Sequence, residues 1–154
     1  MARVIGDGMR VQMVGNEPGR ASAMKMMLSG LSKGLCALFV ESGLAAKKQG
    51  MLPEMIEAYE TIYPGVMSIV GRMLPTYVKH AARRAVEMRE TEQTAQSAGV
   101  EPRVLSAVRE VHEMIAAAME DAQEEMDVAG VIEWLDERGV MSPAWQASTK
   151  ENKE

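Results

Sequence analysis

Residues 20–48, RASAMKMMLSGLSKGLCALFVESGLAAKK, contain no proline and are rich in Ala, Leu and Met, which are good helix formers. Pro18 and Gly19 precede this stretch, and Gly50 follows it in a position suited to a left-handed C-cap. The stretch therefore predicts one long helix. Because apolar residues lie almost all around it, we expect it to be the buried central helix of an all-α domain.

The rest of the chain predicts shorter helices and one different segment. The N-terminal residues Val11, Met13 and Val14 follow a Gly6-Asp7-Gly8 turn and predict a short β-hairpin or strand. Gly6-x-Gly8 also fits a phosphate loop, but a strand rather than a helix follows it, which favours the turn. Proline and glycine positions predict the remaining helices at Pro53 to about Tyr59, Val66–Leu74, Val78–Ala98, Pro102 to about Glu125 and Val128–Glu137.

Charge and cysteine content exclude several classes of function. With 17 basic and 22 acidic residues the chain has no broad basic field, so we expect no nucleic-acid partner. Cys36 is the single cysteine, and His80 and His112 are far apart, so no disulfide framework or metal site is expected. No run approaches the roughly 18 apolar residues of a membrane helix, and a signal-peptide core is missing. We therefore predict a cytoplasmic protein that does not bind membranes.

Lys25 stands between methionines in the long helix and belongs to a polar stripe. At about 100° per residue, Ser22, Ser29, Ser32, Lys33 and Cys36 lie roughly within 80° of Lys25, and Gly30 and Gly34 lie on the opposite side. The glycines predict close approach of another helix. Burying unpaired polar groups costs several kcal/mol each, so the stripe is expected to line a cleft or meet a polar surface.

Two interpretations of Lys25 remain open at this point. Its ammonium group can extend from the first turns of the helix into solvent, with its methylenes along the methionines. Alternatively, it is a partly desolvated general acid/base whose pKa is lowered from about 10.4 towards neutrality. The spacing of residues does not choose between them.

The sequence VGNEPGRASAMKMMLSGLSKGLCALFVESGLAAKKQG resembles the start of the helical C-terminal domain of the β-hydroxyacid dehydrogenases, the superfamily of 3-hydroxyisobutyrate and 6-phosphogluconate dehydrogenases. Lys33-Gly34 and the later RRAVEM at 83–88 are similar to phosphogluconate-dehydrogenase-like proteins of unknown substrate. The likeness extends over roughly residues 10–118. It implies NAD or NADP as cofactor, bound mainly by a separate Rossmann domain, and a homodimer formed through the helical domain.

The resemblance also implies roles for particular residues. Lys25 matches the catalytic lysine, which takes the proton of the substrate hydroxyl, and Ser29 stands where relatives have a substrate-binding asparagine. Leu28 replaces the histidine of 6-phosphogluconate dehydrogenases, which argues against that substrate. Val86-Glu87 stands where many relatives have Lys-Asp, with Arg83 or Arg84 as a replacement for the lost base; a solvated helix face with Arg–Glu pairs is the other interpretation. The candidate substrate-binding residues are Ser22, Ser29, Ser32, Lys33, Arg84 and Glu87.

A strand followed by Gly-x-Gly-x-x-Gly and a helix does not occur in the sequence, so we expect no dinucleotide-binding domain in it. The expected parts are residues 1–15 as a remnant of such a domain, 16–140 as the helical substrate-binding and dimerisation domain, and 141–154 as a flexible tail. The chain would be either an excised fragment or a natural stand-alone descendant, inactive alone.

The predicted function is that of a domain of an NAD(P)-dependent oxidoreductase that acts on a small β-hydroxyacid, with or without decarboxylation. The alternative is a stand-alone, non-catalytic dimerisation module that assembles through the Gly30/Gly34 face.

Overall fold

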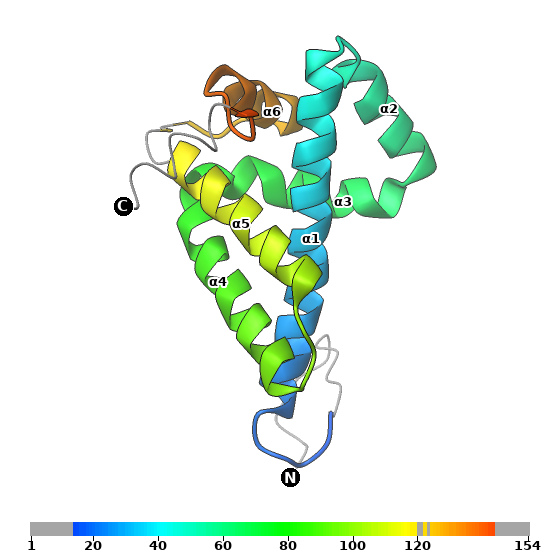
Figure 1. The fold of residues 1–154 in the computed structure, drawn as a ribbon. Helices are drawn as coiled ribbons and strands as arrows, with labels where there is room; N and C mark the ends of the chain where they lie inside the picture. Colours follow the sequence, from blue (N-terminus) through cyan, green and yellow to red (C-terminus); the bar gives the residue numbers. More distant parts are fainter. Residues whose placement is uncertain (1–13, 120–121, 123, 144–154) are drawn as a thin grey trace, which may run out of the picture.

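The computed structural model describes residues 14–119, 122 and 124–143, and these residues form an all-helical fold without a strand (Figure 1). The all-α prediction is therefore confirmed. Val14 is irregular, and the other residues of the predicted N-terminal strand lie outside the described part, as does most of the predicted tail. The elements are α1 (Arg20–Lys48), α2 (Leu52–Ile62), α3 (Pro64–Met73), the 3-10 helix η1 (Leu74–Thr76), α4 (Tyr77–Ser97), α5 (Arg103–Ala118) and α6 (Val128–Glu137).

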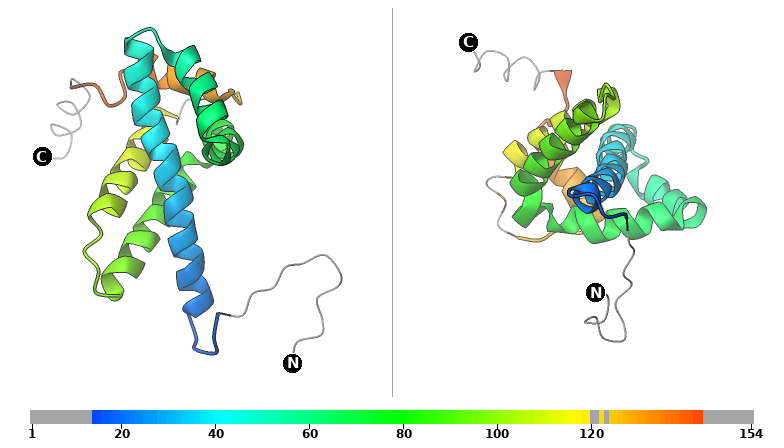
Figure 2. Two further views of the ribbon diagram at one scale, coloured as in Figure 1. Left: turned by 90° about the vertical axis from the view of Figure 1, so that its right-hand side faces the viewer. Right: turned by 90° about the horizontal axis from the view of Figure 1, so that it is seen from below.

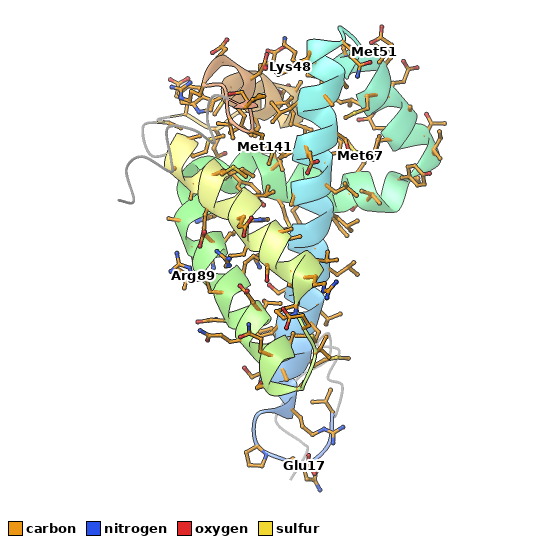
Figure 3. All side chains as sticks on the ribbon, in the orientation of Figure 1. Glu17, Lys48, Met51, Met67, Arg89 and Met141 are labelled. Atoms are coloured by element: carbon orange, nitrogen blue, oxygen red, sulfur yellow. The ribbon has the colours of Figure 1, made fainter. Side chains whose placement is uncertain are left out.

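Helix α1 is the axis of the fold. The antiparallel helices α4 and α5 lie along one side of it, α2 and α3 lie on another side, and α6 lies near its C-terminal end (Figures 1 and 2). Glu17 and Lys48 are found at its two ends (Figure 3). Gly50 has a φ of 72°, and the next N–H, of Met51, donates to the carbonyl of Ala46 at 2.9 Å. This arrangement satisfies a carbonyl at the helix end and confirms Gly50 as the stop signal.

The main core surrounds the C-terminal half of α1. Its buried side chains come from α1, α2, α3, η1, the start of α4, the end of α5 and α6, and include Phe39, Val40, Leu44, Leu52, Val70, Leu74, Tyr77, Ile115, Ile132 and Leu135. A smaller cluster of Ala37, Met88 and Val108 joins α1 to α4 and α5. The short helices α2, α3 and α6 thus cover only one end of α1.

The expectation that α1 is buried all around is wrong for its N-terminal half. Met24, Leu28 and Leu31 are 44%, 62% and 65% exposed. Helix α1 is nearly three times as long as α2, α3 or α6, so these helices do not reach its first turns. Of the described helices, α4 and α5 lie beside those turns.

Within the described part of the chain, the length and composition of α1 would allow it to cross a membrane. The sequence had predicted no membrane helix. In the relevant window 39% of the residues are buried inside the molecule. Core helices of soluble proteins meet the same criterion, so this observation is weak evidence for a membrane span.

The prediction that Gly30 and Gly34 admit a close helix is confirmed. A Cβ on Gly30 would lie 2.9 Å from Cγ2 of Thr91 in α4 and 3.1 Å from Cδ2 of Leu105 in α5. On Gly34 it would lie 3.7 Å from Cγ2 of Val108. The face at Gly30 therefore packs closely against helices of the same chain, while both glycines also line the groove between α1 and α5.

Several predicted helix boundaries were wrong. Helix α2 continues to Ile62 rather than Tyr59, and α3 begins at Pro64 itself, because a proline at the first helical position lacks only an N–H that would be unpaired anyway. Helix α5 ends at Ala118 rather than near Glu125. Met119, which is 3% exposed, packs into the core directly after this helix end.

Candidate functional site

Lys25 and Ser22 are exposed on the first half of α1, and Ser29 is half-buried one turn further on. Residues four apart on a helix share a side, so the Lys25 and Ser29 side chains lie on one face. Among the described residues Lys25 has no hydrogen-bond or ion-pair partner. It is not desolvated in this structure; desolvation would need a substrate, another domain or another subunit to cover this face.

Lys33 lies at the inner end of the same face and is only 3% exposed. Its Nζ donates a hydrogen bond to Oγ of Ser29 and lies 2.9 Å from Oε2 of Glu87 in α4. Glu87 Oε1 also pairs with Nη1 of Arg83 at 3.2 Å. The structure thus brings together three of the predicted site residues, Ser29, Lys33 and Glu87, which come from two helices.

The Glu87 carboxylate is held in its charged form. Partial burial raises its pKa, but the hydrogen bond from Lys33 and the positive charges of Lys33, Arg83 and Arg84 outweigh that effect, so the pKa lies below its ordinary value. At neutral pH Lys33 therefore faces an ionised partner.

Arg84 and Ser32 do not join this group. Arg84 is buried, and its Nη1 and Nη2 donate to the carbonyl of Met73 at 2.8 Å and to Oγ1 of Thr76 at 2.6 Å. Its guanidinium also lies 4.3 Å from the ring centroid of Tyr77. These contacts fix η1 against α4. Ser32 donates to carbonyls of its own helix, at 3.3 Å to Leu28 and 3.1 Å to Ser29.

A buried pair between Tyr77 and His112 was missed by sequence reasoning. Nδ1 of His112 is 2.9 Å from the carbonyl of Val108, which can only accept, so Nδ1 carries the proton and Nε2 accepts from the Tyr77 hydroxyl at 2.7 Å. Burial, opposed by the Val108 bond and aided by Lys33 and Arg84, lowers the pKa of His112 to about 4. His112 follows Val108 by four residues and precedes Ile115 by three, so it lies on the apolar face of α5. This spacing could have indicated that its side chain is buried.

Cys36, which the polar stripe included, belongs to the core instead. Its side chain is fully buried, with Sγ 4.0 Å from Sδ of Met73. Burial raises the pKa of the thiol to about 11, although Arg84, Tyr77 and Lys33 act in the opposite direction. The thiol stays protonated at neutral pH and is a poor nucleophile.

The described residues offer no built site for a metal or a dinucleotide. They contain no group of three or more His, Cys, Asp or Glu side chains that could hold a metal ion. They also contain no strand–turn–helix unit with a glycine-rich turn, the element that holds a pyrophosphate in dinucleotide-binding folds.

Comparison with known proteins supports a relationship to dehydrogenases. The family model "Domain of unknown function (DUF1932)" matches residues 46–115, a range that includes Glu87 but begins after Lys25. The crystal structure of a conserved hypothetical protein from Sinorhizobium meliloti 1021 is similar, with a TM-score of 0.71 and 30% sequence identity. The match covers 85% of this chain and 45% of that one, so the chain spans less than half the length of this neighbour.

No curated protein matches the chain. The family match and the structural neighbour agree with the resemblance seen in the sequence, which is thereby confirmed. Over residues 46–115 the chain is similar to DUF1932, the C-terminal helical domain of NAD(P)-binding dehydrogenases of the 3-hydroxyisobutyrate and 6-phosphogluconate dehydrogenase type.

Proposed function

We propose that this chain is the substrate-binding and dimerisation domain of an NAD(P)-dependent dehydrogenase that acts on a small β-hydroxyacid, with Lys25 as the general acid/base. The observation that carries the proposal is the placement of Lys25 and Ser29 one turn apart on the half of α1 that α2, α3 and α6 do not reach. This face ends at the buried Lys33–Glu87 ion pair, so polar groups adjoin the proposed substrate position.

The residues of this chain have distinct tasks in the proposed reaction. When bound, NAD(P) supplies the acceptor for the hydride that leaves the carbinol carbon. Lys25, as a neutral amine, takes the proton from the substrate hydroxyl, so that the alcohol becomes a carbonyl group. Ser29 holds the substrate by a hydrogen bond from its hydroxyl.

An ammonium group that is exposed to water keeps its proton and cannot act as a base. Covering the face of Lys25 would remove water from its ammonium group and favour the neutral amine. We therefore expect the proton transfer to occur only when a cofactor-binding domain closes over the first half of α1. A cytoplasmic location is part of the proposal, supported by the single cysteine.

The test uses a complete dehydrogenase in which this chain is joined to a dinucleotide-binding domain. Reduction of NAD and of NADP is followed by the absorbance of the reduced nicotinamide, with a panel of small β-hydroxyacids of different chain length. We expect at least one of them to be oxidised, and analysis of the product decides whether decarboxylation follows. If none of them supports reduction of either cofactor, the proposal fails.

The non-catalytic dimerisation module remains the second candidate, because α1 exposes apolar side chains that a partner would cover. It differs from the first in one respect that can be measured. In a module of this kind Lys25 is dispensable.

A further inference from the structure

Lys33 is the most deeply buried lysine of the described chain, and its side chain is 4% exposed. An ammonium group in such a place must be compensated by partners. It has two partners, Oγ of Ser29 and Oε2 of Glu87. Since it already carries its own counter-ion, Lys33 is poorly placed to bind an acidic substrate directly.

The hydrogen bond between Lys33 and Ser29 has a fixed direction. An ammonium group has three donors and no acceptor, so the oxygen of Ser29 must accept. The hydroxyl hydrogen of Ser29 is then directed to another group. Accepting a hydrogen bond from a positive neighbour also polarises the hydroxyl and strengthens it as a donor.

Ser29 has no other partner for this hydrogen within the described structure. By contrast, the nearby Ser32 donates to carbonyl groups of its own helix. One turn before Ser29, on the same face, stands the exposed ammonium group of Lys25. A ligand between them would meet two donors.

We propose that Lys33 is a positioning residue that fixes Ser29 as a hydrogen-bond donor to the carboxylate of the substrate, with Lys25 beside it. A carboxylate has only acceptors, so it matches this pair. Glu87 neutralises Lys33 and keeps it on Ser29. The inference rests on the proposed function, since it assumes that the Lys25–Ser29 face binds the substrate.

The first test is binding to the 154-residue chain itself. The chain is labelled in its methionine methyl groups, and NMR follows Met24 and Met26, which flank Lys25, during titration with sodium 3-hydroxybutyrate at constant ionic strength. The methyl ester of the same compound has no carboxylate and serves as the matched ligand. We expect saturable shifts with the acid and none with the ester. Equal shifts with both, or no saturable shift with the acid, overturn the inference.

The second test asks whether Lys33 acts through Ser29. Lys33→Met and Ser29→Ala should each weaken binding about threefold to tenfold, the effect of one hydrogen bond. The double variant should be no weaker than either single variant. Lys33→Gln keeps an N–H donor and should restore most of the affinity. The matched control is Lys47→Met, which removes another lysine of α1 paired with a glutamate, Glu133 at 3.0 Å, and should leave binding unchanged.

Additive losses in the double variant overturn the inference, because they mean that Lys33 acts independently of Ser29. Circular dichroism checks the helix content of each variant. If Lys33→Met does not fold, the variant Lys33→Met/Glu87→Gln, which removes both charges, takes its place in the comparison of single and double variants. Failure of the proposed function would appear instead as absent turnover in the complete dehydrogenase. The two failures are therefore distinguishable.

Discussion

At the scale of single residues, Lys25 and Lys33 have opposite environments although they lie about two turns apart on one helix. Lys33 is buried and paired with Glu87, whereas Lys25 is exposed and has no partner among the described residues. The Lys33 ammonium group is buried and already bound to Glu87 and Ser29, so it is poorly placed to contact a substrate hydroxyl. This contrast supports Lys25 as the acid/base and Lys33 as a support.

Lys25→Ala in the complete dehydrogenase should lower kcat by about 10²- to 10⁴-fold, the usual contribution of a general acid/base. The free energy of unfolding should stay nearly unchanged, because an exposed side chain without a partner contributes little to the fold. Steady-state kinetics and chemical denaturation measure the two quantities. Lys48→Ala, at the far end of α1 in a surface pair with Asp136, is the control. Near-normal kcat for Lys25→Ala would favour the non-catalytic module.

His112 makes the stability of the fold depend on pH. Burial lowers its pKa to about 4 from the ordinary value of 6.5, so folding favours the neutral ring. The stabilisation is fully present above about pH 6.5 and is lost as the pH falls to about 4. The total loss of unfolding free energy over this range is about 3 kcal/mol. Denaturation with urea at a series of pH values between these limits should show the loss.

His112→Gln does not titrate in this range, and its unfolding free energy should change less between about pH 6.5 and 5 than that of the wild type. Glu87 and Glu92, whose pKa values are lowered, add their own loss at more acid pH in both proteins. An equal dependence on pH in both proteins would contradict the buried, neutral state of His112.

At the scale of helices, the contact of α1 with α4 and α5 depends on Gly30. A methyl group there would lie 2.9 Å from Cγ2 of Thr91, a buried β-branched side chain whose hydroxyl donates to the carbonyl of Glu87 at 2.9 Å. Such a side chain has little freedom to move away. Gly30→Ala should therefore destabilise the fold by about 1–3 kcal/mol, as overpacking usually does.

Gly71→Ala is the matched control for this prediction. Gly71 lies inside α3, and nothing is within 4 Å of the position of its Cβ. Because alanine is the better helix former, this change should stabilise the chain by about 0.5–1 kcal/mol. Urea denaturation of both variants compares them, and an equal effect of the two substitutions would contradict the close packing at Gly30.

At the scale of the whole molecule, α1 and α5 share an exposed apolar surface. A groove of about 440 Å³ lies between them, with Leu31, Leu38 and Val104 on its walls. These three side chains are 65%, 61% and 76% exposed. Apolar surface of this kind is typical of protein interfaces, and it supports the proposed homodimer.

Sedimentation velocity at micromolar concentration should show a dimer for the wild-type chain and a monomer for Leu31→Glu/Leu38→Glu, since two buried carboxylates would oppose association. Ile62→Glu changes another residue that is 64% exposed, at the end of α2, and should leave the dimer intact. A wild-type monomer would contradict the proposal.

Local patterns were sufficient for the bounds of two helices and for part of the site. The bounds of α1 and α6, the stop at Gly50 and the closeness of Lys25 to Ser29 follow from interactions between residues up to about four apart, which a sequence displays directly. The Gly30/Gly34 face was also recognisable as a contact surface, although the identity of its partner was not.

Contacts between distant residues were decided by the tertiary structure. The pairing of Lys33 with Glu87, the inward position of Arg84 and the Tyr77–His112 bond each join residues from different elements. Only the packing of α2, α3 and α6 at one end of α1 left its first half exposed. The sequence by itself determined which faces each helix presents; the burial of a face depends on which other helices reach it, and that is a property of the assembled fold.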